Sequence, residues 1–178
     1  IYSINKVERS KIRLQRLKFV NKVDIKKTIV DEDNGYLDLD FVLEETQSGE
    51  FKVGAGYSDS SGAIFNIRVQ QDNFLGKGNN VSLEIEKSSY KKLLRYRNTN
   101  PYFTEDGISK STSLVFSETD VSSTSTASYI SDTIAYGVNY NVPVSETRSY
   151  GYGGELILTD YTTTVGSPNN VISFINKY

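Results

Sequence analysis

Four residue types are missing from the 178-residue sequence, which contains no Cys, His, Met or Trp. Without Cys there can be no disulfide framework and no thiolate metal site. Without His the chain lacks the usual base at neutral pH and the commonest metal ligand. These absences argue against most hydrolase and metalloenzyme chemistry, so we expect no enzymatic activity, no cofactor and no metal site.

Long hydrophobic runs are also missing. Hydrophobic residues make up 37% of the chain and the mean hydropathy is −0.42. No stretch approaches the roughly 18 to 20 apolar residues that a membrane-spanning helix requires. A transmembrane β-strand needs only about ten residues of alternating character. The lack of long apolar runs therefore leaves a membrane-spanning β-barrel among the candidate folds. The missing Met predicts a processed product or a piece of a longer protein.

Charge is unevenly distributed, although the net charge is only −2. Nine basic residues lie within the first 27 positions: Lys6, Arg9, Lys11, Arg13, Arg16, Lys18, Lys22, Lys26 and Lys27. A solvated helix face explains them better than a nucleic-acid or lipid-headgroup patch, because aromatic residues are not interleaved with them. We therefore expect no nucleic-acid partner.

Residues 1–45 are typical of the carboxyl-terminal part of a small α+β domain. The predicted elements are a helix at residues 3–17 and alternating strands at residues 22–30 and 36–45. Ser3 can cap the helix, and Asn34-Gly35 is a strong hairpin signal between the strands. The polar residues 46–50 predict a hinge, after which a second domain covers residues 51–178.

The second domain alternates between apolar and polar residues with a period of two, which predicts β-strands. Seven strands are expected, at residues 51–57, 63–70, 81–88, 93–99, 109–119, 128–142 and 149–163. The last two are long for a globular protein but suit tilted strands that cross a membrane. The fold class predicted is therefore mainly β, an incomplete antiparallel transmembrane β-barrel of about seven strands. A soluble β-sandwich with tyrosines at its strand ends is the alternative.

The connections between these strands differ in kind. Those after the second, fourth and sixth strands contain Gly, Pro and aromatic residues, whereas residues 120–127 and the end after Val165 are rich in Ser, Thr and Asn. Outer-membrane barrels show this asymmetry, with short periplasmic turns and longer external loops. The candidate periplasmic turn residues are Asp72, Asn73, Phe74, Gly76, Asn100, Pro101, Tyr102 and Phe103.

Each ordered turn has a structural interpretation. Asp72 and Asn73 can cap the first turn through side-chain to backbone bonds, while Gly76 and Gly78 take positive φ. In the second turn, Pro101 restricts the backbone, and Tyr102 and Phe103 can anchor at the headgroup level. An interfacial girdle would add Tyr140, Tyr150 and Tyr152. A docking surface for periplasmic domains or a lipoprotein is the alternative for the first turn.

Three segments resemble the BamA family of outer-membrane protein assembly factors. They are the first strand FKVGAGY, the turn VQQDNFLGKG at residues 69–78, and NTNPYFTEDGIS at residues 98–109. Ahead of them, RLQRL at residues 13–17 resembles the end of that family's last periplasmic POTRA domain. The resemblance implies an outer-membrane location with a periplasmic amino-terminal part. It also implies a sixteen-stranded barrel, of which this chain would hold only the first seven strands.

The resemblance further implies an insertase that assembles β-barrel proteins, with nascent outer-membrane proteins, periplasmic lipoproteins and the lipid bilayer as partners. The alternatives are a related POTRA-bearing translocator that secretes a polypeptide and a passive outer-membrane channel. An unpaired strand edge in hydrocarbon recruits a partner strand. The candidate edge comprises Phe51, Lys52, Val53, Gly54, Ala55, Gly56 and Tyr57. Gly54 and Gly56 either weaken closure of the barrel at this edge or merely relieve crowding.

The carboxylates Glu84 and Glu86 share the polar side of one predicted strand with Ser82. An acid/base pair would require a closed cleft and a raised pKa, and the sequence indicates neither. We expect them to line the barrel lumen, balanced by Lys52 and Arg68 on neighbouring strands.

Overall fold

The protein is described here by a computed structural model that covers residues 3–31, 36–121, 128–145, 147–164, 166–175 and 177. The chain forms two compact units, Ile1–Ser48 and Gly49–Tyr178.

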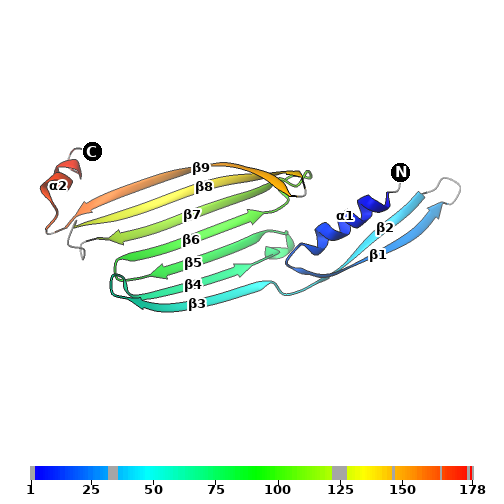
Figure 1. The fold of residues 1–178 in the computed structure, drawn as a ribbon, viewed down its shortest axis with the longest axis horizontal. Helices are drawn as coiled ribbons and strands as arrows, with labels where there is room; N and C mark the ends of the chain where they lie inside the picture. The colour runs from blue at the N-terminus through cyan, green and yellow to red at the C-terminus, as the bar shows by residue number, and fades with distance from the viewer. Residues whose placement is uncertain are drawn as a thin grey trace. The chain divides into compact units, whose positions relative to one another are not determined.

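The first unit is a helix that packs on a β-hairpin, as predicted. It comprises α1 (Ile4–Gln15), β1 (Val20–Asp31) and β2 (Tyr36–Glu45), and the two strands pair antiparallel with Ile25 opposite Phe41. Figure 1 shows α1 running along the hairpin. Val7 of α1 is buried together with Val20 and Val23 of β1, so this small core joins the helix to the first strand. The predicted turn residues Asn34 and Gly35 lie outside the described residues.

One detail of the helix prediction is wrong. Ser3 does occupy the N-cap position with an extended backbone, but its side chain makes no capping hydrogen bond. Its carbonyl oxygen instead accepts hydrogen bonds from the backbone N–H groups of Lys6 and Val7, at 3.1 and 3.2 Å. The helix therefore begins at Ile4 without a side-chain cap from Ser3.

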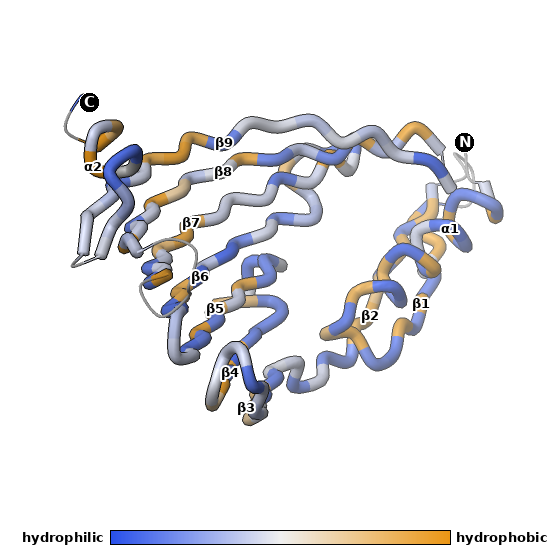
Figure 2. Tube along the Cα trace, turned by 60° about the vertical axis from the view of Figure 1, so that its left-hand side comes forward, coloured by the Kyte–Doolittle hydropathy of each residue, from blue (hydrophilic) through white to orange (hydrophobic). Residues whose placement is uncertain are grey.

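The second unit is a seven-stranded antiparallel sheet in which every strand pairs with its neighbours in sequence (Figure 1). Its strands are β3 (Gly49–Ser58), β4 (Gly62–Gln71), β5 (Asn80–Lys87), β6 (Lys91–Asn100), β7 (Ser109–Asp120), β8 (Tyr129–Ser145) and β9 (Arg148–Thr163). In Figure 2 the strands follow one another around a curve. All seven predicted strands are present, each extended or shifted at its ends by a few residues.

The register gives the sheet two distinct faces. One continuous row of opposed residues crosses all seven strands: Val53, Ile67, Ile85, Leu94, Phe116, Ile134 and Leu158. We name the side that carries this row the apolar face. The adjacent row, on the polar face, begins with Lys52, Arg68, Glu84 and Arg95. Period-two alternation thus places apolar side chains on one face and charged side chains on the other, as strand geometry requires.

The apolar face is largely uncovered. In the second unit the buried hydrophobic residues of the described chain are only Leu93 and Ala135, whereas Val53 is 65% and Leu158 62% exposed. A β-sandwich would bury one face of this sheet against a second sheet, and the described residues of this unit form a single sheet. The architecture is that of a barrel wall, and the sandwich alternative is wrong.

The chain after Gly166 differs from the expected loose end. A short helix, α2 (Asn169–Ile175), follows Pro168, whose carbonyl accepts a hydrogen bond from the N–H of Ile172 at 3.1 Å. Proline fixes φ near the helical value, which favours a helix start here despite the polar composition. Among the described residues, no helix is long and apolar enough to cross a membrane.

Candidate functional site: the edge strand and the ordered turns

Strand β3 is the candidate edge, and it pairs with β4 along its whole length, from Gly49 opposite Gln71 to Ser58 opposite Gly62. Its other side has no partner strand among the described residues. Every residue from Glu50 to Tyr57 is exposed, with Phe51 at 67% and Tyr57 at 77%. The seven predicted edge residues therefore lie together on one accessible strand.

Two charged side chains of β3, those of Glu50 and Lys52, form an ion pair with each other. The Lys52 ammonium lies 2.7 Å from a carboxylate oxygen of Glu50, two residues earlier on the same face. Both side chains are about half exposed, so the ion pair stabilises the strand little.

Within the described sheet, crowding does not require either glycine of the edge. A Cβ placed on Gly54 would come no nearer than 3.9 Å to the Cβ of Asn66, and one placed on Gly56 would meet nothing within 4 Å. Neither residue has a positive φ. Packing and backbone conformation within the described sheet would thus accept alanine at both positions.

The first ordered turn follows β4 and contains a short 3-10 turn, η1 (Phe74–Gly76). Asn73 Oδ1 accepts a hydrogen bond from the N–H of Gly78 at 2.8 Å, and Gly76 and Gly78 have φ values of 71° and 72°. The predicted cap by Asn73 and both positive-φ glycines are confirmed. The Asp72 carboxylate also accepts a hydrogen bond, from the side-chain amide of Asn80.

Leu75 was not identified from the sequence as a special position in this turn. Its φ of 55° is in the left-handed region, and its side chain is 75% exposed. An L-residue in this conformation costs about 1–2 kcal/mol. The turn thus displays an apolar side chain on a strained backbone.

The second ordered turn, between β6 and β7, is held by several local hydrogen bonds, including the following three. Asn100 Oδ1 accepts from the N–H of Tyr102 at 3.0 Å, the N–H of Phe103 donates to the Ile108 carbonyl at 2.8 Å, and Thr104 Oγ1 accepts from the N–H of Ile108 at 3.2 Å. Pro101 lies within the first of these bonded loops, where its fixed φ restricts the backbone. The aromatic side chains of this turn remain half exposed.

Three of the predicted girdle aromatics come together beside this turn. The Phe103 and Tyr140 rings meet edge to face at 5.9 Å, and Tyr140 stacks on Tyr152 at 5.4 Å. The Lys110 ammonium lies 4.9 Å from the Phe103 ring centre and 5.8 Å from that of Tyr140. We call these four residues the lysine–aromatic cluster. Lys110 was not predicted as a member.

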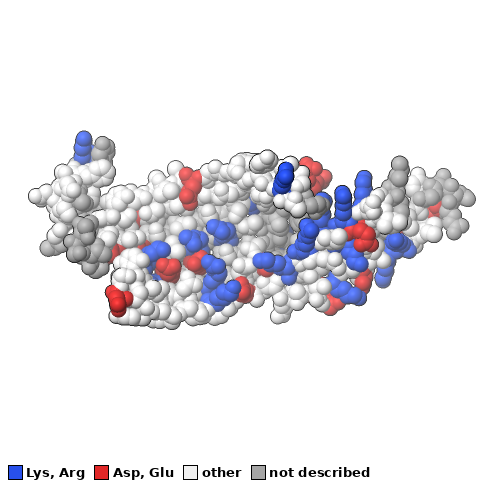
Figure 3. All heavy atoms as spheres, in the orientation of Figure 1, with Lys and Arg blue, Asp and Glu red and all other residues white. Residues whose placement is uncertain are grey.

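The carboxylates of β5 are paired with basic side chains across the polar face. Glu84 accepts hydrogen bonds from Arg68 at 2.7 Å, from Arg95 at 3.3 Å and from the Asn66 amide at 3.3 Å. Glu86 lies 3.3 Å from the Lys91 ammonium. Figure 3 shows basic and acidic side chains intermingled on the visible face of the sheet. This balance of charges is what we expect of a barrel interior.

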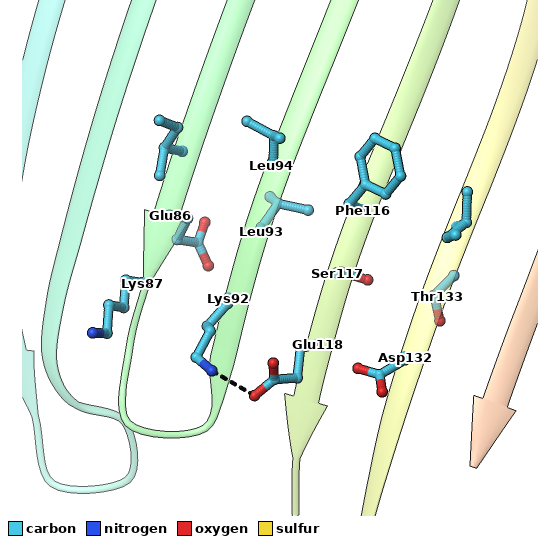
Figure 4. Close-up of a pocket in the computed structure, with 12 residues that line it drawn as sticks. Glu86, Lys87, Lys92, Leu93, Leu94, Phe116, Ser117, Glu118, Asp132 and Thr133 are labelled. Carbon is cyan, nitrogen blue, oxygen red and sulfur yellow. Dashed lines mark hydrogen bonds and ion pairs between the residues drawn. The ribbon is translucent and has the colours of Figure 1, made fainter. Parts of the chain in front are cut away.

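At the other end of the strands, the apolar face ends in a charged rim around an open hollow of about 540 Å³ (Figure 4). Lys92 and Glu118 form an ion pair at 2.7 Å there. In register with them lie Lys87 on β5 and Asp132 on β8. Sequence reasoning did not single out this rim, because the alternation of residues alone does not reveal which strand ends align.

Comparison with known proteins identifies the class. Residues 73–176 match the Omp85 superfamily domain, and the chain belongs to that superfamily.

Within that superfamily, the chain is similar to three proteins named BamA. The chain is 28% identical over 179 residues to the outer membrane protein assembly factor BamA of Neisseria meningitidis, an alignment covering 99% of this chain and 22% of that protein. It is 33% identical over 97 residues to BamA of Buchnera aphidicola, covering 54% and 16% respectively. The crystal structure of BamA from Haemophilus ducreyi lacking POTRA domains 1–3 matches with a TM-score of 0.78 and 27% identity, over 96% of this chain and 32% of that one.

The resemblance to the BamA family is therefore confirmed, although the chain spans only about a fifth of the length of the curated relatives. The sheet is part of an outer-membrane β-barrel, and the amino-terminal part of the chain is periplasmic. β3 directly follows the periplasmic part of the chain, so it begins at the periplasmic end of the sheet. Because consecutive strands run antiparallel, the β4–β5, β6–β7 and β8–β9 connections also lie at that end.

Proposed function

We propose that the full-length protein inserts and assembles β-barrel proteins in the outer membrane, and that β3 supplies the edge to which a nascent strand adds. The similarity to proteins named outer membrane protein assembly factors supports the activity. The exposure of β3 along its length supports the site.

The mechanism requires no catalytic residue. Backbone N–H and C=O groups at an open strand edge have no water to bond in hydrocarbon, so a partner strand that satisfies them is strongly favoured. Backbone bonds supply the affinity and accept many sequences, because the side chains of the incoming strand point to either face. A nascent strand would therefore compete with whichever strand closes the barrel against β3.

The observation that carries this proposal is the pair of glycines with room for a side chain. Gly54 and Gly56 each lower strand stability by roughly 0.5–1 kcal/mol relative to alanine. Neither the local packing nor the backbone of β3 calls for them. A weak edge that opens readily would explain why both positions are glycine.

The glycines also provide the test. In the full-length protein reconstituted in liposomes, G54A and G56A should each slow the assembly of a reporter outer-membrane protein by about 2–5-fold, the rate equivalent of that stability change. Protease protection of the folded reporter measures the rate. The matched control is G154A in β9, where a Cβ would also meet nothing within 4 Å. Unchanged assembly in G54A and G56A would contradict the proposal.

The first ordered turn is proposed as a contact for a periplasmic lipoprotein of the assembly complex. Two exposed apolar side chains, Phe74 and Leu75, support this assignment. The strain at Leu75 also supports it, because strained backbone is often kept where a side chain must be presented.

A polypeptide-secreting translocator and a passive channel are the competing functions. Liposomes that carry the full-length protein distinguish these functions from the proposed one by the final location of a labelled substrate. An insertase leaves a folded reporter in the bilayer, whereas a translocator delivers polypeptide across it and a channel passes only small solutes.

A further inference from the structure

The apolar face has a charged boundary at each end of its strands. At the outer end, Glu118 lies opposite Asp132, and at the periplasmic end Lys110 lies opposite Tyr140. The three lipid-facing rows in between carry no charge on β7, β8 or β9: Leu114, Phe116 and Thr112 on β7, Ile134, Tyr136 and Val138 on β8, and Gly154, Leu156 and Leu158 on β9. Lys110 is therefore the cation that ends this apolar band on the periplasmic side.

The spacing places Lys110 at the headgroup level. Lys110 and Glu118 are separated by eight positions on β7, or roughly 26 Å along a strand that rises about 3.3 Å per residue. At a tilt of about 40° this is roughly 20 Å of height, close to the roughly 25 Å apolar band of outer-membrane barrels.

The lysine is only partly exposed, and its surroundings hold it in place. Its ammonium lies over the rings of Phe103 and Tyr140, and Tyr152 backs Tyr140 from β9. Among the described residues, no carboxylate lies within ion-pair distance of it, whereas Lys92 at the opposite boundary is paired with Glu118. Lys110 is thus a positioned cation with no carboxylate partner in the part of the chain that the structure describes.

We infer that the lysine–aromatic cluster binds the phosphate of a glycerophospholipid in the periplasmic leaflet of the outer membrane. The Lys110 ammonium has three N–H donors, so it can bond phosphate oxygens while it remains over the rings. The rings of Phe103 and Tyr140 lie at the depth where aromatic side chains contact the glycerol region. This inference rests on the membrane location and is independent of the proposed insertase activity.

The charge of the site selects the phosphate rather than the amine of a lipid headgroup. Aromatic rings alone also attract quaternary and primary ammonium groups. Here Lys110 already occupies the ring faces and repels a second cation. We therefore expect anionic phosphatidylglycerol to bind more tightly than a zwitterionic lipid.

Native mass spectrometry of the full-length protein in mild detergent tests this inference. The protein is titrated with phosphatidylglycerol and, separately, with a diacylglycerol of the same chains that lacks phosphate. K110Q should weaken the tightest phosphatidylglycerol binding by about tenfold, as expected for a lost charge-assisted hydrogen bond. K110R should retain it, and diacylglycerol binding should not change. Heat-modifiable gel mobility verifies that each variant is folded.

The matched control is K87Q, which removes a lysine from the same face at the opposite boundary row. Equal losses in K87Q and K110Q would show general attraction to charge and overturn the assignment. So would diacylglycerol binding as tight as that of phosphatidylglycerol in the unaltered protein. If inorganic phosphate displaces the lipid at concentrations similar to that of the lipid itself, the site binds free phosphate and the lipid assignment is wrong.

Discussion

The carboxylate of Glu84 accepts a 2.7 Å hydrogen bond from Arg68 on one neighbouring strand and a 3.3 Å bond from Arg95 on the other. This single side chain therefore joins β4, β5 and β6 across the polar face. Its side chain is 14% exposed, whereas those of its two partners are 45% and 38% exposed. Removing its charge leaves two neighbouring guanidinium groups without a shared anion.

We expect E84Q to lower the stability of the folded full-length barrel by about 1 kcal/mol, discounted for the exposure of both arginines. The temperature at which the folded band is lost on a semi-native gel measures the effect. The matched control is K52Q, which disrupts the exposed pair with Glu50 and should change stability by less than about 0.5 kcal/mol. Equal effects of the two changes would show that the bridging position of Glu84 is unimportant.

Adjacent glycines of β9 should respond in opposite ways to the same substitution. A Cβ on Gly153 would collide with the carbonyl oxygen of Val138 and with Asn139, whereas one on Gly154 would meet nothing within 4 Å. The backbone of β8 cannot move aside without disturbing its ladder, so G153A should destabilise the barrel by about 1–3 kcal/mol. G154A should be neutral or slightly stabilising.

Heat-modifiable mobility of the two full-length variants, prepared side by side, measures the difference. A G153A protein as stable as G154A would contradict the close approach of β8 and β9 at this point.

Two substitutions of Leu75 separate the effect of backbone strain on stability from the effect of the side chain on partner binding. L75G relieves the left-handed conformation and should leave the protein at least as stable as before, whereas L75A keeps the strain and gains nothing. If the side chain contacts a lipoprotein, both variants should lose the co-purified partner to a similar extent. Retention of the partner by both variants would leave the turn with a structural role alone.

The strands could be predicted because a half-buried strand leaves a period-two signature, and the row from Val53 to Leu158 makes that signature continuous across the sheet. The turns were predictable where one residue type satisfies a backbone need, as at Asn73 and Gly76. The short helix α2 was missed because its Ser- and Asn-rich surroundings resemble a loop.

The lysine–aromatic cluster was beyond sequence reasoning for a different reason. Lys110, Tyr140 and Tyr152 are far apart in the chain, and only the pairing register of β7, β8 and β9 brings them into one row. A shift of one residue in either pairing would move one partner to the opposite face. The left-handed backbone of Leu75 likewise has no signal in the sequence, because leucine rarely adopts it.

Site-specific disulfide formation shows whether β3 is an edge open to an incoming strand. Single cysteines at each position from Lys52 to Tyr57 of the full-length protein are combined with cysteines along a stalled substrate strand. An N66C variant in β4, which is paired on both sides, serves as the control. If β3 is such an edge, we expect crosslinks whose substrate position shifts in step with the β3 position, and few crosslinks at N66C. Uniform absence of crosslinks along β3, or equal crosslinking at N66C, would contradict it.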